Sequence, residues 1–222
     1  MRIGLYGGTF NPIHMGHLRA AEEVREAMGL DLVYFIPAGT PPHKVDGELA
    51  LAEHRLEMVR LATKNNPYFM ISDFEVRRAE RSYTIDTLRF FLSSLRQRTE
   101  WFLMMGIDAF AELDTWKAAD ELTTLCNLVV HTRDSGDNLG VSENALGSIK
   151  RFQYTKADDH YTNPNGRELY LVKTTYIPVS ATAIRRAARL GRSIRYLVPL
   201  EVADYISRQR LYRREVTDRD QR

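Results

Sequence analysis

Cysteine is nearly absent from this chain of 222 residues, with Cys126 its single instance. One cysteine excludes an internal disulfide framework and a zinc site built from several thiolates. No apolar run approaches the roughly 18 residues of a membrane-spanning helix. The N-terminal residues MRIGLYGG also lack the long apolar stretch of a secretory signal. These absences predict a cytoplasmic protein with no membrane partner.

An excess of charge of one sign is also lacking. The chain has 31 Lys and Arg against 29 Asp and Glu, a net charge of +2. Nucleic-acid-binding domains are usually strongly basic, so no nucleic-acid partner is expected. One stretch departs from this balance, because residues 185–195 contain five arginines and no acid. Such a run is more often a solvated helix face than a contact for polyanions, and both interpretations stay open.

Three familiar motifs are missing near the glycine-rich stretch GGTFNPIHMGH, residues 7–17. There is no G-x-x-x-x-G-K-[ST] phosphate loop and no G-x-G-x-x-G dinucleotide fingerprint after the first apolar run. His14 and His17 are three residues apart rather than four, with no adjacent carboxylate, so the H-E-x-x-H zinc motif is absent too. The stretch therefore needs another explanation, and no resident metal site is expected.

What is present is a regular alternation of apolar runs with helical patterns. The runs that read as strands are 3–6, 32–36, 69–76, 101–105, 128–131 and 169–172. Helical spacing covers 15–28, 51–64, 84–96, 183–190 and 200–208. This order predicts an α/β fold with a doubly wound parallel sheet, which binds ligands at the carboxyl ends of its strands.

The stretch 7–17 lies at such a strand end. Gly7 and Gly8 remove side chains where the chain leaves the first strand, so that a ligand can approach the backbone. The helix that follows presents unpaired N–H groups and a positive dipole end, which favour an anion. His14 and His17 lie on one face of its first turn and can donate hydrogen bonds to phosphate oxygens. The alternative is one capping histidine and one core histidine; two histidines in this setting favour the phosphate cradle.

These residues carry a family resemblance. GGTFNPIHMGHL resembles the HxGH signature of the nucleotidyltransferase superfamily, and VSATAIR at 179–185 resembles its second motif, I-S-x-T-x-I-R. Three further stretches, PAGTPPHK at 37–44, RSYTIDTL at 81–88 and GIDAFAELDTWK at 106–117, are similar to bacterial nicotinate mononucleotide adenylyltransferases. The resemblance departs at Asn11, where the family often has an acid, and at Ala181, where it often has a second serine.

The resemblance implies a Rossmann-like nucleotidyltransferase fold with a C-terminal helical piece. The expected domain spans residues 1–211, followed by an Arg-rich tail, 212–222, expected to be poorly ordered. The implied reaction transfers the adenylyl group of ATP to nicotinate mononucleotide and releases pyrophosphate, by in-line attack without a covalent intermediate. ATP and nicotinate mononucleotide are then the partners, and Mg²⁺ arrives with ATP. A homo-oligomer stays open.

The resemblance also assigns residues to the phosphates of ATP. It implies a catalytic set of His17, His14, Lys44 and Arg185. His17 is expected to donate to the α-phosphate in the transition state. The residues expected to bind ATP are Gly8, Thr9, Phe10, His14, His17, Gly106, Asp108, Ser180, Thr182 and Arg185. Asp108 would accept a ribose hydroxyl, and Arg185 would hold the leaving β- and γ-phosphates.

The second substrate carries a nicotinate carboxylate. The backbone N–H groups of Tyr83 and Thr84 open a helix and are expected to bind it. Trp116 would stack on the ring, a contact worth about 0.5–2 kcal/mol. Lys44 would bridge phosphates of both substrates, and Arg133 would bind the mononucleotide phosphate.

Two other functions remain as alternatives. A pantetheine-phosphate adenylyltransferase shares both superfamily motifs but has no need of SYTIDTL or Trp116. A non-catalytic adenylate-binding module would keep Gly8 and Asp108. It would not need His14, His17, Lys44 and Arg185 together.

Overall fold

A computed structural model describes residues 1–41, 49–94, 98–133 and 142–213 of the chain. The strands are β1 (Arg2–Gly8), β2 (Leu32–Pro37), β3 (Phe69–Ile71), β4 (Glu100–Gly106), β5 (Asn127–Arg133), β6 (Thr155–Lys156), β7 (Tyr161–Thr162) and β8 (Glu168–Thr174). The helices are α1 (Met15–Met28), α2 (Ala52–Thr63), α3 (Thr84–Ser94), α4 (Ile107–Ala111), α5 (Ala119–Leu125), α6 (Glu143–Arg151), α7 (Ala181–Arg189) and α8 (Leu200–Arg208), with a 3-10 turn η1 (Leu113–Thr115).

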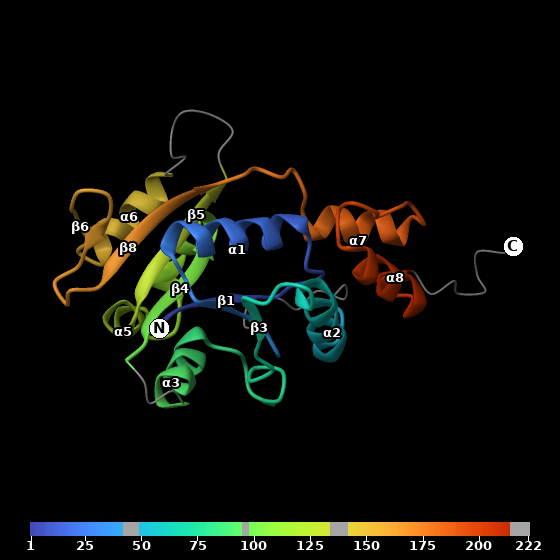
Figure 1. The fold of residues 1–222 in the computed structure, drawn as a ribbon, viewed down its shortest axis with the longest axis horizontal. Helices are drawn as coiled ribbons and strands as arrows, with labels where there is room; N and C mark the ends of the chain where they lie inside the picture. Colours follow the sequence, from blue (N-terminus) through green and yellow to red (C-terminus); the bar gives the residue numbers. More distant parts are fainter. Residues whose placement is uncertain (42–48, 95–97, 134–141, 214–222) are drawn as a thin grey trace, which may run out of the picture.

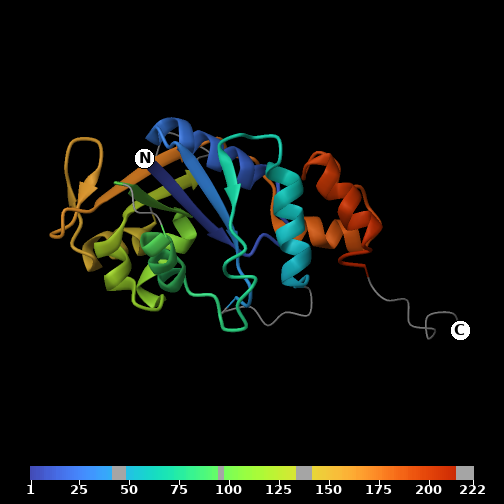
Figure 2. The same cartoon turned by 60° about the horizontal axis from the view of Figure 1, so that its bottom comes forward.

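One sheet runs through the centre in the order β3-β2-β1-β4-β5-β8-β7-β6 (Figures 1 and 2). The first six strands in this order pair in parallel, while β7 pairs antiparallel with both β6 and β8. From β1 the chain proceeds outward to β2 and β3, then returns to place β4 on the other side of β1. The strand order therefore reverses between β1 and β4, and a ligand crevice is expected at the carboxyl ends of these two strands. The α/β, doubly wound architecture expected from the sequence is confirmed.

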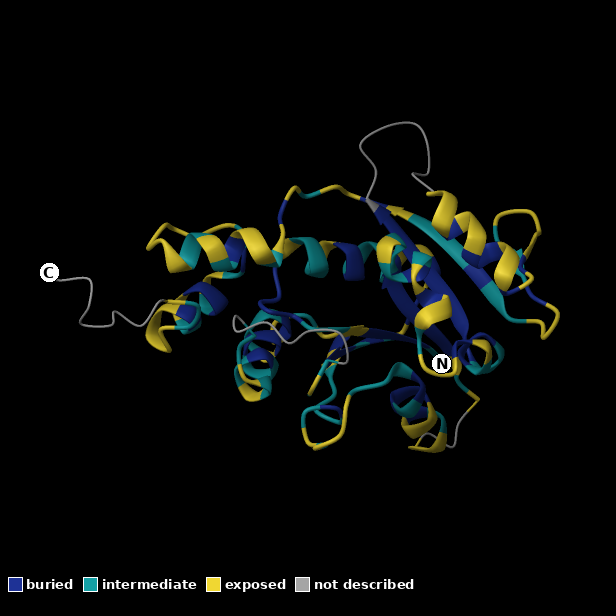
Figure 3. Ribbon diagram, turned by 180° about the vertical axis from the view of Figure 1, so that it is seen from behind, coloured by how far each residue is buried: buried dark blue, intermediate teal, exposed yellow. Residues whose placement is uncertain are grey.

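Alternation along the central strands produces two separate core clusters. In β1, Ile3 and Leu5 belong to one cluster and Tyr6 to the other; in β4, Leu103 and Met104 divide in the same way. Helices α1, α2, α7 and α8 contribute apolar side chains to the Tyr6 cluster, whereas α3 to α6 contribute to the Leu5 cluster. Figure 3 shows the central strands buried while the outer faces of the helices remain exposed. Burial on both faces explains why these strands are almost continuously apolar.

The C-terminal helices pack beside α2 at one end of the molecule (Figure 1). His54 of α2 and the hydroxyl of Tyr205 in α8 are 2.8 Å apart. The backbone N–H of Met15, at the start of α1, donates to the carbonyl of Leu197 at 3.0 Å. Beyond α8, the hydroxyl of Tyr212 donates to Oδ1 of Asn11 at 2.8 Å. The C-terminal piece therefore contacts the motif that follows β1.

The structure also corrects several element predictions. The strand expected over 69–76 ends at Ile71, because a turn closed by the N–H of Arg77 and the carbonyl of Asp73 (3.0 Å) follows it. Helices α4, α5 and α6 and the β6–β7 hairpin were not expected. Helices α4 and α5 and the hairpin strands have seven residues or fewer, too few for a periodic pattern, whereas α6 has the same nine residues as α7 and α8. Short length therefore accounts for the omission of α4, α5 and the hairpin, but not for that of α6.

Candidate active site

Helix α1 places the two motif histidines against each other. His14 is the N-cap, in extended conformation (φ −145°, ψ 172°), and His17 lies in the first turn. Their rings stack with centroids 3.6 Å apart at an interplanar angle of 21°. The expectation that both rings lie on one face is confirmed. His14 is also the capping residue and only 3% exposed, so the capping alternative describes part of its role.

One hydrogen bond fixes the orientation of the His17 ring. The backbone N–H of His14 donates to Nδ1 of His17 at 3.2 Å. Because Nδ1 accepts this bond, the proton of the neutral ring lies on Nε2. Nε2–H is therefore the side of His17 that can donate to an oxygen of a phosphate.

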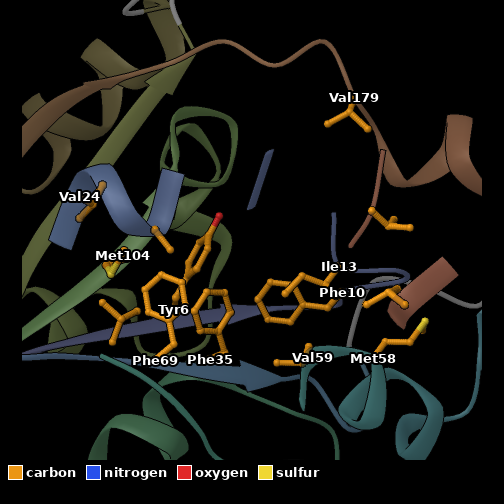
Figure 4. Close-up of a cluster of buried hydrophobic side chains, with 14 of the residues drawn as sticks. Tyr6, Phe10, Ile13, Val24, Phe35, Met58, Val59, Phe69, Met104 and Val179 are labelled. Carbon is orange, nitrogen blue, oxygen red and sulfur yellow. The ribbon is translucent and has the colours of Figure 1, made fainter. Parts of the chain in front are cut away.

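Aromatic packing holds this pair from the side of the sheet. The Phe10 ring meets His17 edge-on at 5.2 Å, and Tyr6 meets His17 at 6.5 Å and Phe10 at 5.8 Å. A Cβ atom on Gly8 would lie 2.9 Å from the Phe10 ring, so glycine is needed there for packing as well as for approach. Phe10 adopts φ 46°, a strained conformation for a large residue. Figure 4 shows Tyr6, Phe10 and Phe35 in this buried cluster.

The second motif docks on the first. Ser180 is the N-cap of α7, and its Oγ accepts from the N–H of Ala183 at 3.2 Å. A Cβ on Gly16 would lie 3.2 Å from both the His14 ring and the Val179 side chain, so the two motifs meet at Gly16. Arg185 donates to the carbonyl of Asn11 at 3.0 Å. The two motifs, about 170 positions apart in the chain, are therefore in direct contact, and the carbonyl of Asn11 is one of the groups that join them.

The guanidinium of Arg185 also donates to the hydroxyl of Thr182, at 3.3 Å. These bonds orient Arg185 between the start of α7 and the loop that follows β1. Ser180 and Thr182 are exposed beside it. The structure therefore brings Arg185, Ser180 and Thr182 to the motif that contains His14 and His17.

The strand order reverses between β1, which ends at Gly8, and β4, which ends at Gly106. Tyr6 of β1 aligns with Met104 of β4. Asp108 follows Gly106 in the first turn of α4 and is exposed. An exposed carboxylate at the end of the strand beside β1 matches the expected position of a ribose contact.

The residues expected to bind nicotinate lie around the start of α3. Thr84 is the first residue of this helix, and the carbonyl of Tyr83 accepts from Asp86 at 3.0 Å. Lys117 joins the neighbouring segment to it, with Nζ 4.4 Å from the centre of the Tyr83 ring and 3.1 Å from Oδ2 of Asp86. Trp116, the residue before Lys117, is half-buried. The structure thus brings Trp116 to the vicinity of Tyr83 and Thr84.

Three predictions fall outside the described residues. Lys44 lies within 42–48, and the side chain of Arg133, the last residue of β5, is not described. Residues 214–222 of the expected Arg-rich tail are likewise not described, whereas Tyr212 packs against Asn11. The roles assigned to Lys44 and Arg133 remain predictions.

Three buried polar residues near the site were missed by the sequence analysis. Arg55 of α2 is 1% exposed, and Glu75, in the segment before α3, is 8% exposed. His131 of β5 is 3% exposed, and its Nε2 lies 3.2 Å from the Tyr6 hydroxyl. Arg55 lies in the helix expected over 51–64 and Glu75 near the end of the strand expected over 69–76, and neither pattern distinguishes a buried charged residue from a solvent-exposed one. His131 offered a signal, as a histidine at the end of an apolar strand.

Burial shifts the pKa values of the two charged residues. It lowers the pKa of the Arg55 guanidinium and raises the pKa of the Glu75 carboxyl. Hydrogen bonds from Thr87 and Ser82 act against the shift of Glu75 without overcoming it. Both shifts follow from the cost of moving a charge out of water.

Within residues 1–41, 49–94, 98–133 and 142–213, no group of three or more His, Cys, Asp or Glu side chains is placed to hold a metal ion. In the same ranges no helix is both long and apolar enough to cross a membrane.

Comparison with known proteins identifies the family. Residues 5–187 match the family model described as cytidylyltransferase-like. A probable nicotinate-nucleotide adenylyltransferase of Geobacter metallireducens is 46% identical over 214 residues, covering 96% of this chain and 98% of the relative. Its counterpart in Geotalea daltonii is 45% identical over 215 residues, with the same coverage.

A solved structure shares the fold at much lower identity. The nicotinic acid mononucleotide adenylyltransferase of Plasmodium falciparum, complexed with NaAD, aligns with a TM-score of 0.71 at 18% identity, covering 95% of this chain and 97% of that one. Together with the joined histidine and arginine motifs, these matches show that the chain belongs to the nicotinate-nucleotide adenylyltransferases of the cytidylyltransferase-like family.

Proposed function

We propose that this protein transfers the adenylyl group of ATP to nicotinate mononucleotide, giving nicotinate adenine dinucleotide and pyrophosphate in NAD biosynthesis. The mononucleotide phosphate attacks the α-phosphorus of ATP in line, a new P–O bond forms, and the bond to the β-phosphate oxygen breaks. The observation that carries the proposal is the contact between two motifs that lie far apart in the sequence. The stacked His14–His17 pair and Arg185 converge on one strand end.

The chemistry needs positioning and charge stabilisation more than a base. The attacking phosphate is already an anion, so no general base is required. Nε2–H of His17 donates to the α-phosphate as its charge develops, and His14 holds the ATP phosphates beside it. Arg185, with Ser180 and Thr182, holds the leaving β- and γ-phosphates at the start of α7.

The remaining ATP contacts follow from the strand ends. Backbone N–H groups of Gly8, Thr9 and Phe10 line the nucleotide after β1. Gly106 leaves room at the end of β4, where Asp108 accepts a ribose hydroxyl. The support for these roles is position, since both strand ends flank the point where the strand order reverses.

The mononucleotide binds at the start of α3. The N–H groups of Tyr83 and Thr84 meet the nicotinate carboxylate, because the first N–H groups of a helix have no intrahelical partner. Trp116 stacks on the ring. Lys44 and Arg133 complete the phosphate contacts.

Magnesium enters as part of the MgATP substrate. The described residues provide no group of three His, Cys, Asp or Glu side chains that could form a protein cage. Mg²⁺ in such sites usually keeps phosphate oxygens and water as ligands, which is why it is proposed to arrive with ATP. A cytoplasmic location stays a prediction, and a homo-oligomeric state stays open.

The decisive assay compares the acid and the amide substrates. Pyrophosphate release from MgATP is measured with nicotinate mononucleotide and with nicotinamide mononucleotide in parallel. We expect the acid to react much faster, because only its carboxylate matches the start of α3. Equal rates would defeat this account of carboxylate recognition.

Two further arms test the alternatives. If phosphopantetheine were the one acceptor of the three that supported pyrophosphate release, the activity would be that of a pantetheine-phosphate adenylyltransferase instead. Binding of ATP without pyrophosphate release from any of the three acceptors would identify a nucleotide-binding module.

A further inference from the structure

Arg55 is the largest of the fully buried side chains in the described parts of the chain. Its guanidinium donates to four backbone carbonyls: Thr9 at 2.9 Å, Ala38 at 2.5 Å, Gly39 at 2.7 Å and Ala50 at 3.0 Å. Within the described ranges it forms no ion pair with a carboxylate. A buried cation is costly, and here the carbonyls of loops offset that cost.

The carbonyls that Arg55 holds belong to the loops of two adjacent strands. Thr9 follows β1, and Ala38 and Gly39 follow β2. The two loops also touch directly, since the N–H of Ala38 donates to the carbonyl of Gly8 at 2.9 Å. Arg55 therefore fixes the loop after β2 against the loop that begins the phosphate site.

On its other side, Gly39 packs on the segment that leads into α3. Its N–H donates to Oγ of Ser82 at 2.9 Å, and the N–H of Ser82 donates to the carbonyl of Thr40 at 3.0 Å. A Cβ atom on Gly39 would overlap the carbonyl oxygen of Glu75. Only glycine allows this approach, so the loop after β2 and the segment before α3 are in direct backbone contact.

Glu75 completes the connection to α3. Its carboxylate accepts from the hydroxyl of Thr87 at 2.5 Å, and the nearby Ser82 hydroxyl also acts to lower the pKa of this carboxyl. Thr87 lies one turn after Thr84, the first residue of the helix. A continuous path thus runs from Arg55 through Gly39 and Ser82 to Glu75 and α3.

We propose that Arg55 and Glu75 are positioning residues that join the phosphate loop after β1 to the start of α3. We call this connection the Arg55–Glu75 brace; it comprises Arg55, Gly39, Ser82, Glu75 and Thr87. Both side chains are buried, at 1% and 8% exposure, and in this proposal they act through the groups that they hold. The proposal rests on the proposed function, in which ATP binds near the loop after β1 and the mononucleotide binds at the start of α3.

The reaction explains why such a brace matters. Two separately bound substrates must hold the attacking oxygen in line with the α-phosphorus, and a misplacement of about 1 Å can cost on the order of 10²-fold in rate. The brace sets the spacing between the two binding elements. Its loss therefore lowers kcat, while each substrate alone still finds its own binding groups.

The sharpest variants change one group in the path. Ser82→Ala removes the hydroxyl that accepts from Gly39 and lies near Glu75, and Ser82→Thr restores a hydroxyl. Glu75→Gln removes the charge at nearly constant shape, and Arg55→Lys replaces the planar fork by a single point donor. The matched controls are Glu80→Gln, an exposed acid of the same segment, and Arg60→Lys, an exposed residue of the same helix.

We expect Ser82→Ala, Glu75→Gln and Arg55→Lys each to lower kcat by about tenfold. The dissociation constants of ATP and of the mononucleotide, each measured alone, should change less than about threefold. Ser82→Thr should recover most of the rate, and the controls should match the native chain. The Ser82→Ala/Glu75→Gln double variant should be no slower than the slower single variant, because both changes break one path.

Hydrogen–deuterium exchange gives a readout that does not depend on turnover. In Ser82→Ala, the backbone amides of residues 39 and 82 should both exchange faster than in the native chain, while the exchange rates of the β5 amides should stay unchanged. A native kcat in Ser82→Ala, or faster exchange in only one of the two segments, would overturn the brace. If Arg55→Lys does not fold, the kcat and the exchange rates of Ser82→Ala still test the brace. Failure of the native chain to release pyrophosphate would instead reject the proposed function, and the exchange experiment would still test the brace.

Discussion

The phosphate end of the site and its mononucleotide end are held by different forces. At the phosphate end, Phe10 and Tyr6 pack edge-on against His17, and His14 stacks on it. At the mononucleotide end, the start of α3 is held through two buried polar side chains: Arg55 donates to Gly39, whose N–H donates to Ser82, and Glu75 accepts from Thr87.

The difference has a physical reason. The phosphate end lies on a strand and a helix that already share a hydrophobic core, so apolar packing is available. The mononucleotide end lies on loops, whose backbone groups must be satisfied when they are buried. A buried guanidinium supplies several donors from one side chain and so can hold loops that have little apolar surface.

The largest expected effect concerns the phosphate end. His17→Ala should lower kcat by roughly 10²–10³, the usual loss for one donor to a transition-state anion. His54→Ala is the matched control, because His54 bonds Tyr205 on the far side of α2. Pyrophosphate release under saturating substrates measures both. A loss below tenfold for His17→Ala would remove His17 from its catalytic role.

A smaller effect is expected when the mononucleotide end is overpacked. In Gly39→Ala the new methyl group would overlap the carbonyl of Glu75, so the loop after β2 must shift. We expect a fall in kcat of about tenfold and a loss of stability of about 1–3 kcal/mol. Chemical denaturation and steady-state assays measure the two.

Gly147→Ala is the control for this substitution, since a Cβ at that helical position meets nothing within 4 Å. It should leave kcat unchanged and raise stability by about 0.5–1 kcal/mol, the usual gain for alanine over glycine within a helix. Native turnover and stability in Gly39→Ala would contradict the close contact with Glu75.

The buried charge should also appear in the pH dependence of stability. Burial raises the pKa of Glu75 above its ordinary value of 4.5. The folded state thus binds this proton more tightly than the unfolded state does. The stabilisation that results is complete below pH 4.5 and is lost as the pH rises through the raised pKa.

Glu75→Gln should abolish this loss, so its unfolding free energy relative to the native chain should increase as the pH rises above 4.5. Glu80→Gln should show no such rise above pH 4.5, because hydrogen bonds at that exposed site lower the pKa of Glu80 and its titration is complete below that pH. Denaturant titrations between pH 4 and 8 test the sign. Parallel curves for the two variants would contradict the difference in burial.

The smallest expected effect is that the Cys126 thiol does not react with a thiol reagent in the folded chain. Burial raises the pKa of the Cys126 thiol to about 12, so it is protonated and inaccessible in the folded chain. A thiol reagent at pH 8 should label it only after unfolding. The same assay verifies that each variant at either end retains its folded core; rapid labelling of the native chain would contradict the burial.

Short-range chemistry explains what could be predicted. His14 and His17 lie within one helical turn and Ser180 caps its own helix, so their local geometry follows from spacing, whereas their roles are implied by the family resemblance. The parallel strands could be recognised because burial on both faces makes them continuously apolar. The short helix containing Asp108 and the early end of the third strand could not, because five and three residues are too few for a period.

The sequence by itself determined the α/β order of the elements, the two nucleotidyltransferase motifs and the family. These features are encoded by residues that act on their near neighbours. Only the tertiary structure decided that Arg185 would anchor on Asn11 and that Arg55 would hold Thr9, a residue 46 positions away. The partners of Arg55 are backbone carbonyls, which every residue type provides. No pattern of side chains in the sequence can therefore predict which carbonyls Arg55 will bind.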